Sequence, residues 1–238
     1  MKALITGASS GIGKEIAKKL LSLNYKVLAV GRDFDKCDIK DKDFIIHTCD
    51  LSDTTCVHTF LQDIKDKDIS ILVNSAGIGY FAPHEELSID NIEKIIYLNL
   101  TLPLLLSKVF LKTLKKNRGY IFNICSISGI KQAPFGAVYG ATKAGLRHFS
   151  SSLFAENRKS GLKVVSINPD ITNTNFFHKL NFFPSDDPLS YIEPACIAEV
   201  IEDILHKRDG TVISDITIEP QIFKLNKRKY KDTRKDLL

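Results

Sequence analysis

Residues 4–13 read LITGASSGIG, and this stretch decides the fold. It begins inside a short apolar run, residues 2–6, which predicts a β-strand. It ends inside residues 11–23, where apolar side chains recur on one face at helical spacing and predict an amphipathic helix. Strand, tight turn and helix therefore follow one another directly.

Three glycines give this turn its chemistry. Gly7 permits a sharp turn out of the strand, Gly11 lets the backbone approach a ligand, and Gly13 lets the helix lie close to the sheet. Free N–H groups at the start of such a helix favour a phosphate anion. Lys14 is followed by Glu15, and no glycine stands five residues before Gly13, so the pattern excludes a P-loop. The stretch therefore predicts a site for a dinucleotide pyrophosphate.

Apolar runs alternate with helical periodicity along the rest of the chain. We expect strands at 26–30, 44–48, 69–74, 120–125, 162–168 and within 211–218, and helices at 54–64, 88–116, 136–159 and 194–207. The alternation predicts an α/β fold: a doubly wound, Rossmann-like, mostly parallel sheet with helices on both faces. Only ten residues, mostly charged, separate Arg32 from Asp43, so the helix between the second and third strands should be shortened or absent.

Length and composition are those of an ordinary globular protein. A chain of 238 residues with 44% hydrophobic residues predicts one domain, residues 1–223, followed by a basic extension, residues 224–238. Five scattered cysteines without a C-x-x-C pattern predict reduced thiols and a cytoplasmic protein. No histidine stands at metal-ligand spacing, so we expect no metal.

Neither a signal peptide nor a membrane span is expected. Met1 and Lys2 lead directly into the first strand, which leaves no room for a leader. The most apolar stretch, residues 95–111, contains Asn99 and Lys108, and it is too polar and too short to span a membrane.

The net charge of +5 lies entirely in the extension. Residues 224–238 hold seven Lys/Arg and two Asp/Glu, whereas the remainder holds 26 of each. The extension is either a solvated terminus or a contact with an acidic partner such as a carrier protein, nucleic acid or anionic membrane. Tyr230 is its one aromatic residue, so aromatic interleaving does not support nucleic acid as the partner.

Polar residues also follow later strands. Residues 74–77 read NSAG, Ser126 follows another strand, and Tyr139 and Lys143 are spaced to share one face of a helix. Because parallel strands end at the same edge of a sheet, a hydroxyl, a phenol and an ammonium group can converge there. A free tyrosine titrates near pH ~10, and a nearby ammonium group favours its phenolate. The set predicts a proton-transfer site.

Together, the G-x-x-x-G-x-G spacing of residues 7–13, the NSAG string and Tyr-x-x-x-Lys with Ser126 thirteen residues upstream resemble the short-chain dehydrogenase/reductase family. The resemblance covers nearly the whole chain. It implies a seven-stranded sheet and hydride transfer between nicotinamide C4 and a carbonyl or secondary alcohol carbon. Tyr139 would transfer the proton and Ser126 would hold the substrate oxygen. Lys143 would lower the pKa of the phenol and bind the nicotinamide ribose.

Asn99 completes this catalytic set. Pro103, four residues later, has no N–H and its ring pushes against the carbonyl of Asn99, which is therefore released from the helix ladder. In the resembled family this asparagine carbonyl holds a water that relays protons to Lys143. The alternative is a kinked core helix with an incidental asparagine.

The end of the second strand favours NADP(H). Arg32 can clamp a 2′-phosphate bidentately, and Ser9 can add a hydroxyl donor. Asp33 could compete for Arg32 or bind a ribose itself, so NAD(H) is a less favoured alternative. Asp50 and Leu51 resemble the family's adenine-binding pair.

Residues 169–174 resemble the family's P-G-x-x-x-T, with Asp170 in place of the glycine. The backbone at Thr172 and the hydroxyl of Thr174 would fix the nicotinamide carboxamide. Residues 175–193 then form a substrate loop with five aromatic residues. These either close as an apolar lid over a hydrophobic carbonyl compound or pack the loop onto the body.

The chain is thus expected to be an NADP(H)-dependent oxidoreductase acting on a small carbonyl or alcohol, with catalytic residues Ser126, Tyr139, Lys143 and Asn99. The expected cofactor contacts are Gly7, Ser9, Ser10, Gly11, Ile12, Gly13, Arg32, Asp50, Leu51, Asn74, Ala76, Gly77, Tyr139, Lys143, Pro169, Thr172 and Thr174. By analogy with the family, helices 88–116 and 136–159 would pair in a homo-oligomer. The alternatives are a 3-oxoacyl carrier-protein reductase and a non-catalytic NADP(H)-sensing protein.

Overall fold

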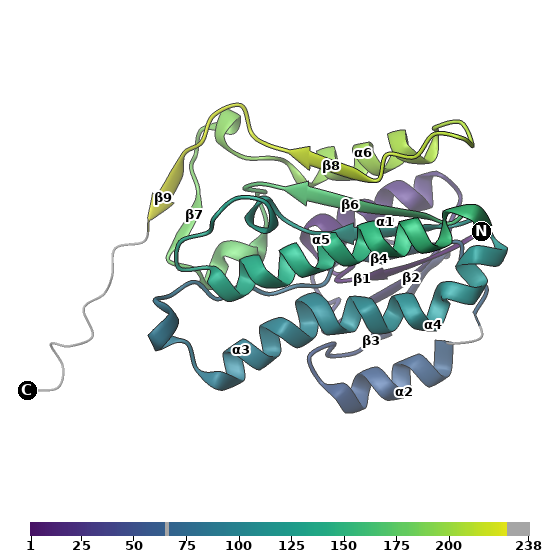
Figure 1. The fold of residues 1–238 in the computed structure, drawn as a ribbon, viewed down its shortest axis with the longest axis horizontal. Coiled ribbons are helices and arrows are strands. Elements are labelled where there is room, and N and C mark those ends of the chain that lie inside the picture. Colours follow the sequence, from purple (N-terminus) through teal and green to yellow (C-terminus); the bar gives the residue numbers. More distant parts are fainter. Residues whose placement is uncertain (65–66, 228–238) are drawn as a thin grey trace, which may run out of the picture.

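A seven-stranded sheet runs through the computed structural model, which describes residues 1–64 and 67–227 (Figure 1). Its strands are β1 (Lys2–Thr6), β2 (Lys26–Gly31), β3 (Phe44–Thr48), β4 (Ile71–Asn74), β5 (Tyr120–Ile124), β6 (Lys163–Pro169) and β8 (Asp215–Ile218). They lie in the order β3-β2-β1-β4-β5-β6-β8, and all neighbours are parallel. The strand order reverses between β1 and β4, where open α/β sheets bind ligands.

Helices cover both faces of the sheet, which confirms the doubly wound fold. They are α1 (Gly11–Ser22), α2 (Thr54–Ile64), α3 (Ile89–Ile96), α4 (Leu102–Lys116), α5 (Ala137–Asn157) and α6 (Pro194–Leu205). Side chains of a strand alternate between its faces. Ile5 of β1 therefore packs with Ile16 and Ile201 of α1 and α6, whereas Leu4 packs with Leu106 and Leu153 of α4 and α5.

The connection between β2 and β3 has no helix, as predicted from its length. Two turns replace the helix: the N–H of Asp35 donates to Oδ1 of Asp33 at 2.7 Å, and the N–H of Cys37 donates to the carbonyl of Phe34 at 2.9 Å. The ring of Phe34 contacts that of Phe44 at a centroid distance of 6.0 Å. This contact holds the connection against the end of the sheet.

The predicted single helix over residues 88–116 is broken in the middle. Ser88 caps its start, since its hydroxyl accepts from the N–H of Asn91 at 3.2 Å. Residues 97–101 form a π-helical turn in which the N–H of Leu102 donates to the carbonyl of Tyr97. Pro103 explains the break, because it cannot donate to the carbonyl of Asn99.

Residues 89–116 are also the one helical stretch, among the residues described, that is long and apolar enough to cross a membrane. The sequence predicts that the apolar residues 95–111 are too short and too polar to span a membrane, but the helical stretch extends beyond them on both sides. A core helix passes the same test. One face of this helix is buried in the body, and 44% of its most apolar window is buried.

A second, two-stranded sheet was missed in the sequence. β7 (Phe182–Pro184), in the substrate loop, pairs antiparallel with β9 (Leu225–Lys227). The predicted extension therefore begins on a strand that pairs with the substrate loop, and it is not wholly separate from residues 1–223. The rest of the extension, residues 228–238, lies outside the described residues.

Candidate active site

The carboxyl ends of β1 and β4 are tied together by Thr6. Its hydroxyl accepts from the N–H groups of Ser75 and Ala76, both at 3.1 Å, and donates to the carbonyl of Val73 at 3.4 Å. A Cβ on Gly7, whose φ is +69°, would lie 3.0 Å from the Cα of Ala76. The glycine turn and the NSAG string are therefore in direct contact.

The other two glycines of the turn are equally constrained. A Cβ on Gly13 would collide with the carbonyl oxygen of Gly7, so only glycine lets α1 lie this close to the turn. A Cβ on Gly11, whose φ is +54°, would lie 3.2 Å from Cγ2 of Thr174. Ser10 is the N-cap of α1, and its side chain makes no capping bond, which leaves the first N–H groups of the helix to a ligand.

Ser126, Tyr139 and Lys143 meet at the end of β5. A side-chain hydrogen bond joins Ser126 to Tyr139. The hydroxyl of Ser126 also accepts from the N–H of Ser128 at 3.1 Å. Nζ of Lys143 donates to the carbonyl of Ile124 at 2.8 Å and lies 5.7 Å from the ring centroid of Tyr139. The structure thus brings together the hydroxyl, phenol and ammonium groups.

Burial dominates the electrostatics of the site. Burial raises the pKa of Tyr139 to about 12, and the hydrogen bond from Ser126 only partly opposes this. Burial also lowers the pKa of Lys143 and raises that of the neighbouring Cys125 thiol to about 11. In the protein alone, burial is thus the largest influence on the pKa of Tyr139, and the lowering expected from Lys143 and a positively charged nicotinamide stays a prediction.

Asn99 lies beside this set. Its side chain accepts from the N–H of Ile78 at 2.9 Å and donates to the carbonyl of Ile78 at 2.8 Å. A Cβ on Gly77 would lie 3.2 Å from Oδ1 of Asn99 and 3.6 Å from Nζ of Lys143. The side chain of Asn99 thus fixes the chain after β4, while its role in a proton relay stays a prediction.

A buried polar chain behind the site was missed in the sequence. Nδ2 of Asn74 donates to Oδ1 of Asn123 at 2.7 Å, and Nδ2 of Asn123 donates to Oγ of Ser150 at 2.7 Å. Ser150 in turn donates to the carbonyl of Leu146 at 2.7 Å. The chain links β4, β5 and α5. An asparagine inside the apolar run of residues 120–125 was the available signal.

A polar cavity of about 340 Å³ opens beside the glycine turn. Its lining includes Ser9, Ser10, Gly11 and Thr174, with Lys14 and Lys36 balanced in charge by Glu15 and Glu193. Ser9 lies at the end of β2, because a Cβ on Gly31 would be 3.1 Å from its hydroxyl oxygen. Lys36 was missed in the sequence, since only the turns that replace the helix bring it to the glycine turn.

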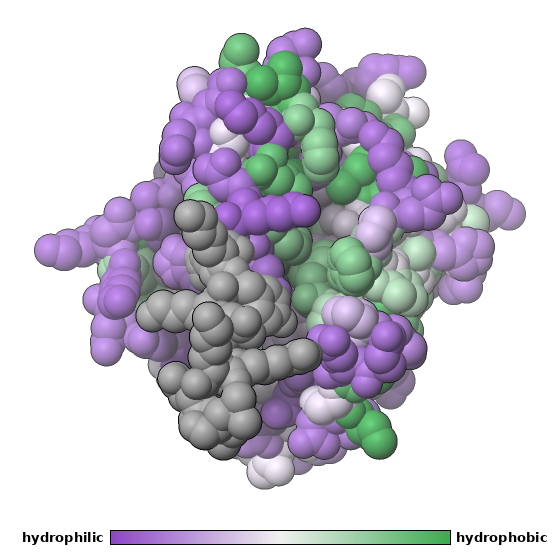
Figure 2. All heavy atoms as spheres, turned by 90° about the vertical axis from the view of Figure 1, so that its left-hand side faces the viewer, coloured by the Kyte–Doolittle hydropathy of each residue, from purple (hydrophilic) through white to green (hydrophobic). Residues whose placement is uncertain are grey.

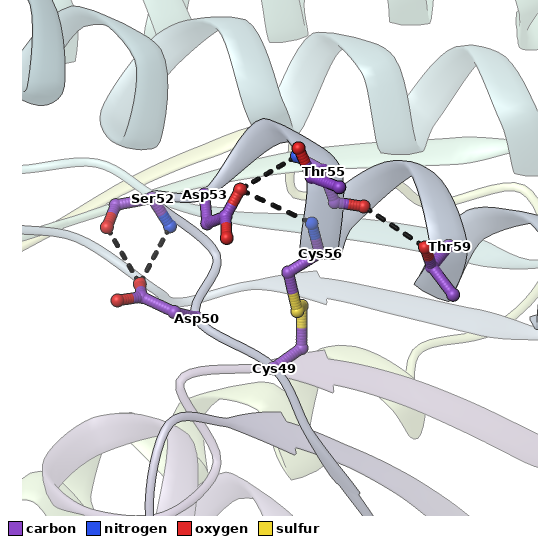
Figure 3. The surroundings of a disulfide bond; sticks show 7 residues. All are labelled: Cys49, Asp50, Ser52, Asp53, Thr55, Cys56 and Thr59. Carbon is purple, nitrogen blue, oxygen red and sulfur yellow. Dashed lines mark hydrogen bonds between the residues drawn. A yellow bond between two sulfur atoms is a disulfide. The ribbon is translucent and has the colours of Figure 1, made fainter.

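Asp50 and Leu51 follow β3 as expected, and Leu51 is buried. Oδ1 of Asp50 accepts from the N–H and the hydroxyl of Ser52 at 3.0 and 2.7 Å (Figure 3). Burial raises the pKa of Asp50, but the bonds from Ser52 and the positive charge of Arg32 outweigh it and hold the pKa below its ordinary value. Arg32 is exposed and lies close enough to act on this carboxylate.

The prediction of reduced thiols is wrong for one pair. Cys49 and Cys56 form a disulfide that joins the end of β3 to α2 and brackets Asp50 (Figure 3). Cys37, Cys125 and Cys196 are free. The pairing depends on the turn between β3 and α2, which returns the chain to the end of the strand. A count of cysteines does not contain that information.

The segment after β6 lies against the glycine turn. Pro169 is buried at the end of the strand, and Thr172 is buried with its hydroxyl donating to the carbonyl of Asp170 at 2.9 Å. Asp170, which stands where the family has glycine, accepts from the N–H of Ile171 at 2.8 Å and so supports the turn. Burial raises the pKa of Asp170. Thr174 reaches Gly11, as described above.

Among residues 1–64 and 67–227, no group of three or more His, Cys, Asp or Glu lies together as a metal site would require. The prediction that the protein uses no metal stays untested by this.

Comparisons with known proteins agree on the family. The short chain dehydrogenase family profile matches residues 1–183. An uncharacterised short-chain type dehydrogenase/reductase of Sinorhizobium fredii is 37% identical over 230 residues, 92% of this chain and 90% of that protein. Among solved structures, an alcohol dehydrogenase of Thermococcus sibiricus, complexed with 5-hydroxy-NADP, has a TM-score of 0.81 at 26% identity and covers 92% of this chain and 96% of its own. A 4-hydroxyisoleucine dehydrogenase complexed with NADH has a TM-score of 0.80 at 27% identity, with 92% and 97% covered.

Proposed function

The chain belongs to the short-chain dehydrogenase/reductase family, and we propose that it is an NADP(H)-dependent oxidoreductase that interconverts a carbonyl and a secondary alcohol. The observation that carries this proposal is the convergence of Ser126, Tyr139 and Lys143 at the strand ends. They lie beside the glycine turn (residues 7–13) and Gly77, which together we call the glycine cradle and which suit a dinucleotide. We further propose that the protein is a cytoplasmic homo-oligomer, as its family membership favours; the Cys49–Cys56 disulfide removes reduced thiols as an argument for that compartment.

The cradle supports a nicotinamide dinucleotide. Gly7, Gly11 and Gly77 let the glycine turn and the segments after β4 and β6 lie against one another, since a Cβ at each would press on Ala76, Thr174 or Asn99. The first N–H groups of α1 have no competing serine cap and are available to an anion. Gly77 lies next to Lys143, so the cradle extends from the pyrophosphate end to the proposed catalytic residues. When bound, the cofactor would supply or accept a hydride at nicotinamide C4.

The chain's own residues would handle the proton. In the reductive direction the carbonyl carbon gains the hydride, and its oxygen gains a proton from the phenol of Tyr139. Ser126, already hydrogen bonded to Tyr139, would hold that oxygen and stabilise its developing charge. Lys143, held by the carbonyl of Ile124, would orient the ribose and return a proton to the phenolate.

The raised pKa of Tyr139 predicts a pH-dependent rate for alcohol oxidation and a nearly pH-independent rate for carbonyl reduction. A phenol with a pKa of about 12 stays protonated near neutrality, so it can donate a proton but is a poor base. We expect kcat/KM for alcohol oxidation to rise about tenfold per pH unit between about pH 7 and pH 9, and carbonyl reduction to change little. Initial rates in both directions measure this. A steep fall of the reductive rate over that range would show that the proton donor has a pKa far below 12, which contradicts a raised pKa for Tyr139 in the working enzyme.

The preference for NADP(H) or NAD(H) has to be inferred from this chain's own residues, because similar structures contain an NADP derivative in one case and NADH in another. The 2′-phosphate site we propose is formed by Arg32, Ser9 and Lys36. One oxygen of the Asp33 carboxylate accepts from the N–H of Asp35 in a turn, which favours Arg32 over Asp33 as the residue that meets the ribose. Arg32 follows β2, Ser9 lies against Gly31 at the end of that strand, and Lys36 lines the same cavity as Ser9, so two cations and a hydroxyl are available near the place where the adenine ribose would bind.

Titration of NADPH and NADH against Arg32→Ala and Lys36→Ala tests this proposal. A hydrogen bond between charged groups contributes about 1.5–3 kcal/mol, so each change should weaken NADPH binding roughly 10- to 100-fold. NADH binding should change by less than about twofold, because it has no 2′-phosphate. Lys40→Ala, an exposed lysine in the same connection, is the matched control. Equal binding of both cofactors to the wild type would rule out this phosphate site, and binding of neither would remove the proposed function.

A further inference from the structure

Phenylalanine side chains from separate segments converge on the ring of Tyr139. Phe81, from the chain after β4, lies 5.3 Å from it between centroids, and Phe176, from the chain after β6, lies 5.8 Å from it. Phe182 of β7 lies 5.0 Å from Phe81, and Phe177 joins Phe176 to Phe182 at 5.4 and 5.7 Å. We call Phe81, Phe176, Phe177 and Phe182 the phenylalanine wall.

Two glycines make room for this wall. A Cβ on Gly79 would lie 2.5 Å from Cζ of Phe176, and one on Gly136 would lie 2.6 Å from Cε1 of Phe81. The rings therefore fill positions that any other residue at Gly79 or Gly136 would occupy. Glycine at these two positions therefore allows the two aromatic rings to pack beside the phenol of Tyr139.

The wall leaves little water at the phenol. Tyr139 is only 8% exposed, and burial is the first cause of its raised pKa. A substrate carbonyl can reach the phenol only if Phe81 or Phe176 turns aside, and the substrate then takes over that ring's contacts. An apolar planar group replaces them well. A charged group would lose its water there without gaining a partner from the wall.

The apolar surface continues to the outside at Phe135. This residue has a φ of +63°, a backbone conformation that bulky residues rarely adopt, and its side chain is 64% exposed. Its carbonyl accepts from the N–H of Ala82, next to Phe81, and its neighbour Gly136 contacts the ring of Phe81. Figure 2, viewed toward the end of the molecule that holds β7 and β9, shows hydrophobic side chains gathered in a hollow between polar ones. A strained, exposed aromatic residue beside a site points to a contact role.

From this geometry we infer that the substrate is an aryl ketone or the corresponding secondary alcohol, with no charged group on the carbon next to the carbonyl. Phe81 and Phe176 are the residues that select it. This inference rests on the proposed function, because it takes Tyr139 as the group that meets the substrate oxygen.

The test compares acetophenone, butan-2-one and acetoacetate as substrates with NADPH. We expect kcat/KM for acetophenone to exceed that for each of the others by at least about 100-fold, since only its phenyl ring can replace the displaced wall ring. Phe176→Leu and Phe81→Leu keep an apolar side chain but remove the ring. Each should reduce the advantage of acetophenone about tenfold, chiefly through KM. Phe154→Leu, a partly buried phenylalanine on α5 that contacts Arg158, is the matched control.

The outcomes separate the inference from the proposed function. Turnover of acetoacetate at least equal to that of acetophenone, or an acetophenone advantage unchanged in both wall variants, overturns the inference and leaves the function standing. If no ketone is reduced, the proposed function fails, and calorimetric titration of acetophenone into the NADPH complex decides the inference. Binding that Phe176→Leu weakens supports a site for an aryl group, and no binding overturns it.

Discussion

Replacing Tyr139 with phenylalanine should lower kcat for carbonyl reduction about 1000-fold, because a positioned general acid contributes about 10²–10⁴ in rate. The substitution removes one oxygen and keeps the ring, so the contacts with Phe81 and Phe176 remain. NADPH affinity should stay within about twofold, since the phenol's proton is needed in the reaction and the cradle glycines hold the cofactor. Stopped-flow rates with saturating NADPH, together with a fluorescence titration, measure both quantities.

Tyr97→Phe is the control for this experiment. Tyr97 begins the π-helical turn beside Asn99, and burial raises its pKa as it does that of Tyr139. Loss of its hydroxyl should change kcat by less than about threefold, because surface or partly buried hydroxyls away from the chemistry contribute little to the barrier. Retention of more than a tenth of the wild-type rate in Tyr139→Phe would mean that another group delivers the proton, and the sensor alternative would then gain weight.

Replacing Asn123 with leucine should lower the free energy of unfolding by about 2–5 kcal/mol, because two buried polar groups lose their partners at once. Nδ2 of Asn74 would lose its acceptor, and Oγ of Ser150 would lose its donor. Oδ1 of Asn74 already has no hydrogen-bond partner within the described residues. Urea unfolding followed by circular dichroism measures the change.

Two further variants serve as controls for this measurement of stability. Asn117→Leu removes bonds to Asp68 and Ile69 at a more exposed position, and it should cost less than about 1 kcal/mol. Adding Ser150→Ala to Asn123→Leu should cost less than Ser150→Ala alone, because the bond is already lost. Strict additivity of the two changes would show that the polar chain does not act as a unit.

The fold was predictable because its signals are local. The glycine turn specifies a strand and a helix within a dozen residues, and periodicity marks most of the other elements to within a few positions of the observed bounds. The missing helix followed from the length of one connection. The break near residue 100 followed in part from Pro103, although the π-helical turn itself was not expected.

The site was predictable only as a set of residue types at strand ends. Tyr139 and Lys143 are four residues apart, and Ser126 lies thirteen residues before Tyr139. This spacing was enough to predict that the three side chains converge. The sign of the pKa shift at Tyr139 depends on burial by Phe81 and Phe176, which lie far away in the chain. No local pattern carries that information.

The features that were missed share this cause. Lys36 reaches the glycine turn through two turns, Asn123 bonds to residues of β4 and α5, and Cys49 meets Cys56 across a bend. Each of these contacts forms because the chain folds back on itself, and the periodicity of the sequence does not show where it does so. β9 is too short for a periodic signal, and its three residues are specified by pairing with β7.

The pairing of β7 with β9 also sets an order of assembly during synthesis. The glycine turn, the proposed catalytic residues and Thr174 all leave the ribosome before residue 180, whereas Leu225–Lys227 emerges later than all of them. Domains fold as the chain emerges, N-terminal parts first. A nascent chain can therefore assemble the glycine turn and its neighbours while β7 still lacks a partner, and the proposed substrate loop gains its second strand only after residue 227 has been added.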